Sequence, residues 1–172
     1  MEKKELELYI HIPFCVRKCN YCDFLSFPAD EDTQRQYVKA LCKEIFYYGA
    51  HCRDYVVSTV YIGGGTPSWL WESDMAEIMD AVHKNFALLP DAEVSVECNP
   101  GTVTAQKFAV YRQSGINRIS LGLQSAQNVE LKMLGRIHTW EQFLKTYELA
   151  RAGGFSNINV DLMSSLPGQH ME

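Results

Sequence analysis

The chain has 172 residues, of which 47% are hydrophobic and 22% charged, enough for one substantial core and too few for two separate domains. The formal net charge is −5 and the Lys and Arg residues are scattered, which excludes the basic surface that nucleic-acid binding requires. No uninterrupted apolar run approaches the roughly 20 residues that cross a bilayer, so we expect no transmembrane segment, and peripheral membrane contact stays open.

The amino-terminal segment "MEKKELEL" is charged and has no apolar signal core. A reducing compartment is therefore expected, and we predict a cytoplasmic protein. In that setting the six cysteines are more suited to metal or cofactor binding than to disulfide bonds.

Five short runs rich in β-branched and aromatic residues predict strands along the chain. They lie at residues 6–12, 57–63, 93–98, 118–123 and 157–163. Helical patterns separate them. The first is predicted to begin beside Thr33, with Gln36 completing a capping box, and its apolar positions are Tyr37, Leu41, Ile45 and Tyr48.

The later helical patterns have equally clear limits. The second has an apolar face made of Met75, Ile78, Met79, Val82 and Phe86. A third helix is expected from about residue 104 to 114, before Gly115. The fourth runs from 139 to 152, with Thr139 and Gln142 as a capping pair and a glycine pair after its last residue.

Alternation of strand and helix predicts an α/β fold with a parallel sheet, either an open doubly wound sheet or a (β/α) barrel. Every unusual motif lies at the carboxyl end of a predicted strand, where such sheets bind ligands. The motifs are, in chain order, "CVRKCNYC", "GGGTPS", "ECNPG", "LQS" and "DLMSSLPG". A site built from all five strand ends favours a barrel mouth.

We expect only part of a barrel, with about five βα units. Five strands cannot close the usual ring of eight, and no helix follows the fifth predicted strand. Residues 1–172 are therefore expected to be the amino-terminal part of a barrel domain, with the rest of the barrel and a carboxyl-terminal domain absent.

Three cysteines, Cys15, Cys19 and Cys22, are the strongest candidate ligands. A structural zinc site needs four ligands, and His11 is the nearest candidate for the fourth, although its place in a strand before Pro13 makes that awkward. Thiols that merely pack are a second alternative. An iron–sulfur cluster is favoured, because closely spaced thiolates hold such clusters. In a [4Fe–4S] cube, three thiolates leave one iron open to a small chelating ligand.

The spacing C-x3-C-x2-C resembles that of the radical S-adenosylmethionine (SAM) superfamily. The resemblance implies that the open iron is chelated by the amino and carboxylate groups of SAM. It also implies a set of SAM-contacting residues in the motifs above: Tyr9, Tyr21, Gly64, Gly65, Thr66, Glu97, Gln124, Arg136 and Asp161. Glu97 ends a strand whose inward face is predicted to be apolar, so its carboxylate needs a cationic or hydrogen-bonding partner.

Across the whole chain the motifs resemble the oxygen-independent coproporphyrinogen III oxidase group. The oxidase branch carries a further cysteine two positions after the third, where this chain has Phe24. Together with "NPGT" and "GRIH", this resembles the HemW-type haem chaperones, which lack the oxidase activity. The oxidase is the alternative, and a zinc-binding interaction module is the alternative from another class, so whether the protein is an enzyme stays open.

The chaperone branch implies haem or a porphyrin as cargo, an electron donor protein and a haem-accepting protein as partners. His11 and His138 are visible candidates for a haem ligand, and neither is singled out by its motif.

Overall fold

Five parallel strands form one sheet whose spatial order is the order of the chain. In this computed structural model, which describes residues 4–169, the strands are β1 (Lys4–Ile12), β2 (Tyr55–Gly64), β3 (Leu88–Cys98), β4 (Arg118–Gln124) and β5 (Asn157–Leu162). All five predicted strands are present. β3 begins earlier than predicted, because Leu88 pairs with Val57 before the register shifts and sets Glu93 opposite Thr59.

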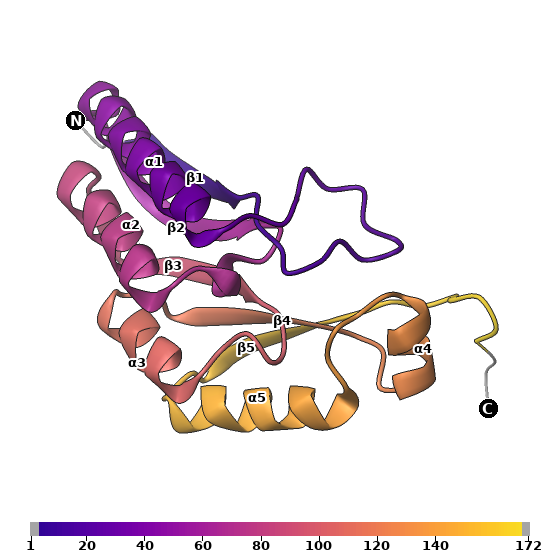
Figure 1. Cartoon of the computed structure of the whole chain (residues 1–172). Helices are drawn as coiled ribbons and strands as arrows, with labels where there is room; N and C mark the ends of the chain where they lie inside the picture. Colours follow the sequence, from indigo (N-terminus) through magenta and orange to yellow (C-terminus); the bar gives the residue numbers. More distant parts are fainter. Residues whose placement is uncertain (1–3, 170–172) are drawn as a thin grey trace.

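The helices lie along the outer side of the curved sheet (Figure 1). They are α1 (Glu31–His51), α2 (Glu72–Asn85), α3 (Ala105–Gln113), α4 (Asn128–Met133) and α5 (Trp140–Ala152), with a short 3-10 helix, η1 (Pro67–Trp69). A doubly wound sheet reverses its strand order and carries helices on both faces. The sequential order and the single helical layer identify the fold as an arc of a (β/α) barrel.

The two faces of the sheet differ in chemistry. Ile62, Val96 and Ile119 are aligned across β2, β3 and β4 and are fully buried in the core with the helices. On the opposite face Ser95 and Glu97 alternate with these residues along β3. The prediction of an apolar inward face around Glu97 is therefore wrong: the apolar residues of β3 are the ones that pack against the helices.

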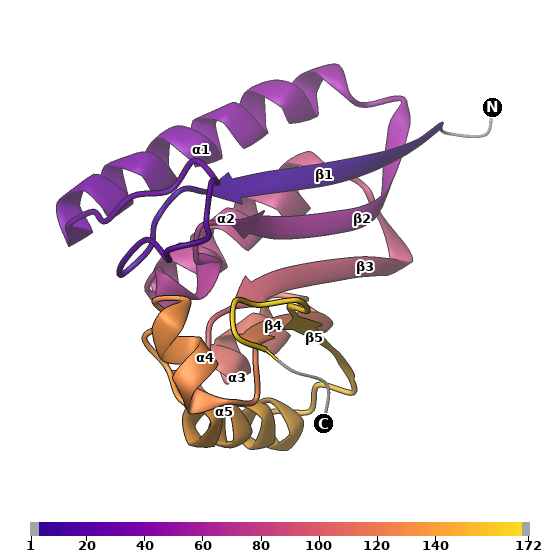
Figure 2. The same ribbon diagram turned by 90° about the vertical axis from the view of Figure 1, so that its right-hand side faces the viewer.

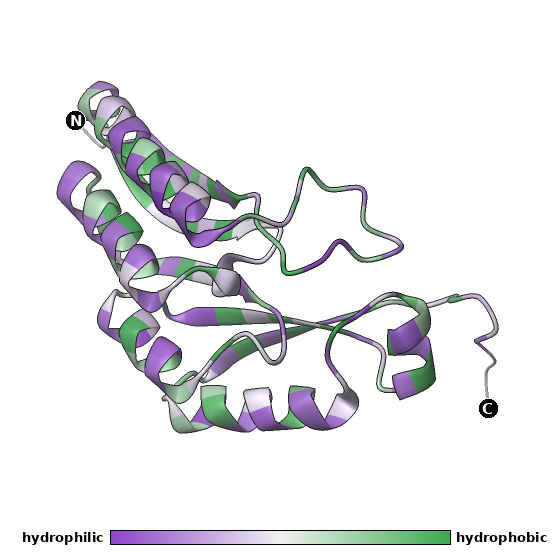
Figure 3. Ribbon diagram, viewed as in Figure 1, coloured by the Kyte–Doolittle hydropathy of each residue, from purple (hydrophilic) through white to green (hydrophobic). Residues whose placement is uncertain are grey.

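Hydrophobic and hydrophilic residues are interspersed along the helices (Figure 3). The predicted apolar face of α2 is confirmed by Met75, Ile78, Met79 and Val82, all 0% exposed. On α1, Ile45 is buried but Tyr48 lies exposed. No helix within residues 4–169 is long and apolar enough to cross a membrane.

Two of the helix starts that sequence predicts are confirmed and one is wrong. Thr139 and Gln142 form the predicted capping box of α5, and Thr104 caps α3. α1, however, begins before Thr33, because the Asp30 carboxylate accepts the Thr33 backbone N–H at 2.8 Å and takes the cap position itself. The short α4 has six residues, too few to show a helical period.

Candidate functional site

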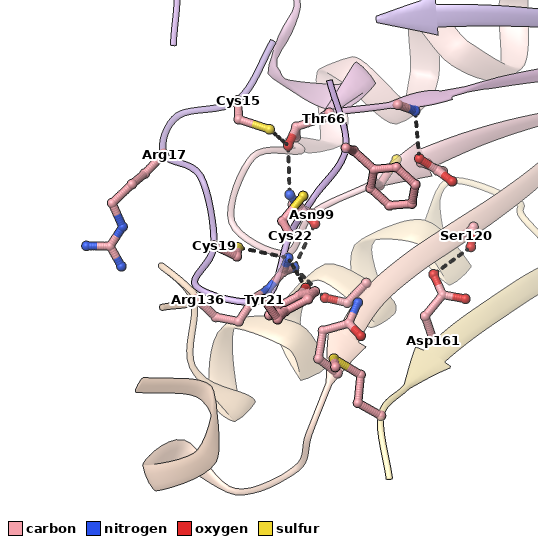
Figure 4. A pocket seen from close by; sticks show the side chains of 18 of the residues that line it. Cys15, Arg17, Cys19, Tyr21, Cys22, Thr66, Asn99, Ser120, Arg136 and Asp161 are labelled. Carbon is pink, nitrogen blue, oxygen red and sulfur yellow. Dashed lines mark hydrogen bonds between the residues drawn. The ribbon is translucent and has the colours of Figure 1, made fainter. Parts of the chain in front are cut away.

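A cavity of about 490 Å³ opens at the carboxyl ends of the strands. Figure 4 shows its lining side chains converging from the loop after β1 and from the ends of β2, β3, β4 and β5. Of the residues that sequence nominated, the cavity is lined by Cys15, Cys19, Tyr21, Cys22, Gly64, Gly65, Thr66, Glu97, Gln124, Arg136 and Asp161. Residues far apart in the chain thus meet at one sheet edge, as parallel strands require.

The loop that carries the cysteines is closed at its base. The Cys15 N–H donates to the Phe27 carbonyl at 3.1 Å, and the Phe27 N–H donates to the Pro13 carbonyl at 2.9 Å. The Phe14 ring is buried between Phe27 and Tyr37 in edge-to-face contacts. His11 adds a further bond to the loop, from Nε2 to the Leu25 carbonyl at 3.1 Å.

The tip of the same loop is held by the carboxyl end of α4, which lies beside it in Figures 1 and 2. The Asn20 N–H donates to the Leu134 carbonyl at 3.0 Å, and its side-chain amide donates to the Met133 carbonyl at 2.8 Å. The Arg17 guanidinium donates to the Gly135 carbonyl at 2.7 Å. With base and tip both fixed, the loop is ordered by the protein's own contacts.

The three thiols of this loop are free, as are the other cysteines. Cys15 is buried, and Cys19 and Cys22 are half-buried at the cavity wall. Within residues 4–169 no three His, Cys, Asp or Glu side chains lie close enough to hold a single metal ion. In a zinc site every sulfur ligand lies about 2.3 Å from the same ion, whereas in an iron–sulfur cube each thiolate binds a different iron.

The glycine turn after β2 lies against the cysteine loop. Gly64 has φ +120°, a conformation that only glycine adopts without strain. At Gly65 a Cβ atom would stand 2.7 Å from the Phe14 carbonyl oxygen and 3.0 Å from the Cys15 sulfur. The close approach brings the Thr66 hydroxyl to 3.4 Å from the same sulfur.

Glu97 has hydrogen-bonding partners, as the sequence analysis expected, and they are groups of the protein itself. Its carboxylate accepts from the Tyr61 hydroxyl at 2.7 Å and from the Gly64 backbone N–H at 3.1 Å. Burial, and then the neighbouring Glu97, raise the pKa of Tyr61 well above its ordinary value, so the phenol stays a proton donor. The carboxylate is fixed at the cavity wall.

Arg136 spans the cavity from the loop after α4. Its Nη2 donates to the Asn99 side-chain oxygen and to the Gly122 carbonyl, both at 2.6 Å. Its Nη1 faces the Tyr21 hydroxyl at 3.4 Å and the Cys19 sulfur at 3.8 Å. Burial raises the pKa of Tyr21 even though Arg136 acts to lower it. A single cation is therefore in contact with the cysteine loop, β4 and the turn after β3.

The far wall of the cavity comes from β4 and β5. The Asp161 carboxylate accepts from the Ser120 hydroxyl at 3.1 Å and from the Asn159 amide at 2.7 Å. Gln124 ends β4 with φ 72°, a left-handed conformation uncommon outside glycine. These groups supply hydrogen-bond acceptors opposite the thiols.

Tyr9 lies outside the residues that line the cavity. It is 61% exposed and stacks on the Tyr61 ring at a centroid distance of 6.2 Å. The two histidines named as haem-ligand candidates are also placed elsewhere. His11 has both ring nitrogens in hydrogen bonds, to the Tyr9 hydroxyl and to the Leu25 carbonyl. His138 is only 3% exposed.

Sequence reasoning missed several residues that line the cavity, chiefly Tyr61, Asn99 and Ser120. Strict alternation along a strand could have found Tyr61, since it precedes Gly63 by two positions and shares its face. Asn99 follows Glu97 by two positions, so the same alternation could have pointed to it. Cys98 also reaches the cavity wall but is buried, and burial raises its pKa to about 12.

The donor set at this site fits an iron–sulfur cluster and an amino-acid ligand. Thiolates are the ligands that such clusters take, and the half-buried Arg136 offers a donor of the kind that binds carboxylates. Bare glycine backbone beside the thiols leaves room for close approach.

Comparisons with known proteins agree with this chemistry. The model of the radical SAM superfamily matches residues 9–172. A protein of Escherichia coli (strain K12) named heme chaperone HemW is 43% identical over 97% of this chain and 44% of its own length. A protein of the same name from Bacillus subtilis (strain 168) is 36% identical over 95% of this chain and 44% of its own.

Among solved structures, coproporphyrinogen III oxidase (HemN) from Escherichia coli, described as a radical SAM enzyme, superposes with a TM-score of 0.89. It is 31% identical, and the match covers 98% of this chain and 39% of that one. The chain thus spans less than half the length of the relatives it matches.

Proposed function

Because the chain belongs to the radical SAM superfamily, we propose that it forms the amino-terminal part of a haem chaperone that binds a [4Fe–4S] cluster and SAM and transfers haem to acceptor proteins. The observation that carries this proposal is the 43% identity, over 97% of the chain, to a protein named heme chaperone HemW. The arrangement of thiols, cation and carboxylates around one cavity supports the same proposal from the side of chemistry.

Cys15, Cys19 and Cys22 would hold the cluster. A loop fixed at its base and at its tip supports this role. The contacts of Phe14 and Asn20 already order the loop, so binding the cluster would cost less conformational entropy. When bound, the cluster would offer its open iron to the amino and carboxylate groups of SAM and would supply the electron that radical SAM chemistry requires.

The SAM contacts would come from the other strand ends. Gly64, Gly65 and Thr66 present close backbone next to the thiols. Arg136 would contact the SAM carboxylate, and Asp161 and Gln124 lie where hydroxyl or ammonium groups could donate to them. The fixed carboxylate of Glu97 would accept from the SAM amino group. These assignments are proposals that binding measurements on variants can test.

The chaperone is favoured over the oxidase by Phe24. The oxidase branch is expected to have a cysteine at this position, whereas here the Phe24 side chain is 68% exposed and contributes to the cavity rim. The similarity to the coproporphyrinogen oxidase structure keeps that activity as the second candidate.

Haem or a porphyrin, an electron donor protein and a haem-accepting protein are the partners that this function requires. A reducing compartment, the cytoplasm, is part of the proposal because the cluster thiols must stay free. Neither His11 nor His138 supports a role as haem ligand, since the first is fully hydrogen-bonded and the second is buried.

Anaerobic reconstitution with iron and sulfide tests the cluster. We expect about four iron and four sulfide per chain, and their loss in a Cys19→Ala variant. Cys52→Ala removes a half-buried thiol outside the cavity and serves as the matched control. Equal iron uptake by both variants would contradict the cluster assignment.

Haem titration of the reconstituted protein then separates the two activities. A chaperone binds haem, seen as a shifted haem absorption band, and leaves coproporphyrinogen III unchanged. Decarboxylation of coproporphyrinogen III in the presence of SAM and a reductant would instead establish the oxidase.

A further inference from the structure

A continuous line of hydrogen bonds joins Arg136 to the first cysteine of the loop (Figure 4). Arg136 Nη2 donates to Asn99 Oδ1 at 2.6 Å. Asn99 Nδ2 then donates to Thr66 Oγ1 at 2.8 Å. The Thr66 oxygen in turn lies 3.4 Å from Cys15 Sγ. Asn99 is the middle of this line and has no part in the function proposed above.

The direction of each bond follows from which atoms can donate. A guanidinium has only donors, so Asn99 must turn its carbonyl oxygen toward Arg136 and its NH₂ group toward Thr66. The Thr66 oxygen is then an acceptor from Asn99, and its one proton is free for another partner. A thiolate has no proton to give, so the Thr66 hydroxyl must donate to Cys15.

The other arm of Arg136 reaches the second cysteine, with Nη1 at 3.8 Å from Cys19 Sγ. The guanidinium therefore orients donors toward two sulfurs, directly at Cys19 and through Asn99 and Thr66 at Cys15. In both cases the partial positive charge of a donor hydrogen lies next to a cysteine sulfur.

The backbone of Asn99 is held rigidly. Its N–H donates to the Ser68 hydroxyl at 3.1 Å, and its carbonyl accepts from the Thr102 hydroxyl at 2.7 Å. The buried Lys107 ammonium donates to the Ser68 and Thr102 carbonyls at 2.8 and 3.2 Å. This anchoring fixes the amide of Asn99 between its two partners.

We propose that Asn99 is a positioning residue that directs the Thr66 hydroxyl onto the Cys15 thiolate and so raises the reduction potential of the cluster. The inference rests on the cluster of the proposed function. A reduced cluster carries one more negative charge than an oxidised one, so a donor at a ligand sulfur stabilises the reduced form more.

The test is an anaerobic redox titration with dithionite, followed by electron paramagnetic resonance, on the reconstituted protein without SAM. Thr66→Val keeps the shape of the side chain and removes the donor, so its midpoint potential should fall below that of the wild type. Thr66→Ser retains the hydroxyl and should retain the wild-type potential. A Thr66→Val variant at the wild-type potential would overturn the inference.

Asn99→Asp tests the positioning itself. A carboxylate has no proton for Thr66, so the Thr66 hydroxyl must turn toward it and away from Cys15, and the potential should fall. Because the added charge also lowers the potential, the same substitution is made in the Thr66→Val background, where the shift should be smaller. Equal shifts in the two backgrounds would refute a role through Thr66.

If Thr66→Val does not retain a cluster, pulsed resonance spectra of wild type and Asn99→Asp in H₂O and D₂O decide. The wild type should show couplings from the Thr66 hydroxyl proton and from the Arg136 donor at Cys19, and Asn99→Asp should lack the first of them. The same set of exchangeable-proton couplings in both proteins would overturn the inference. Failure of the wild type to take up iron would overturn the proposed function as well. A wild-type cluster whose potential none of these variants shifts overturns this inference alone.

Discussion

His138 should make the folded chain sensitive to acid. Its side chain is 3% exposed, and neither ring nitrogen makes a hydrogen bond of good geometry among the described residues; a weak contact with the Leu123 backbone only partly opposes the fall in its pKa. Burial and the nearby Arg136 lower its pKa from 6.5 to about 4. The imidazole is therefore neutral in the folded protein at pH 7, and it resists protonation until well below the pH at which the unfolded chain accepts a proton.

The size of the effect follows from the two pKa values. Above pH 6.5 the ring is neutral in both states and costs nothing in proton binding. As the pH falls toward 4, the imidazole is protonated in the unfolded state but stays neutral in the folded state, so the free energy of unfolding falls. At 1.36 kcal/mol for each pKa unit, the full loss is about 3 kcal/mol, complete near pH 4.

Urea unfolding of the reduced, cluster-free chain at several pH values between 7 and 4 measures this loss. His138→Leu has a similar volume and removes no hydrogen bond of good geometry, so it should match or exceed wild-type stability at pH 7. Its free energy of unfolding should fall less steeply, with a difference from wild type that grows by about 3 kcal/mol by pH 4. Parallel pH profiles for the two proteins would refute the reasoning.

Three further outcomes are expected. Gly64→Ala should lower the free energy of unfolding by about 1–3 kcal/mol, because φ is +120° and a Cβ there would lie 2.7 Å from the His11 ring. Gly154→Ala is the control and should cost less, since a Cβ there meets nothing within 4 Å. Equal losses of stability in urea unfolding would contradict this. With its pKa at about 12, Cys98 should be alkylated far more slowly than Cys52 in the folded chain at pH 8 and equally fast in urea, as peptide mass spectrometry can show. Thr139→Ala removes one half of a capping box and should cost about 1 kcal/mol; an unchanged unfolding midpoint would argue against the cap.

Much of the fold follows from local patterns. The five strands, the capping box of α5 and the place of each motif after a strand all depend on residues within a few positions of one another. The C-x3-C-x2-C spacing belongs to the same class of signal. α1 shows the limit of such reasoning, since Asp30 and Thr33 are both acceptable caps and only the observed bond to the Thr33 N–H decides between them.

What the sequence by itself determined is the set of strands, the chemistry at their carboxyl ends and the cysteine loop. The tertiary structure confirmed the expected arc of a barrel. It alone decided that the face bearing Glu97 is polar, that Asn99 lies between Arg136 and Thr66, and that His138 is buried. The physical reason is that period and capping act over one turn or one strand. The partner of a side chain at a sheet edge is set instead by the register of strands that are distant in the chain.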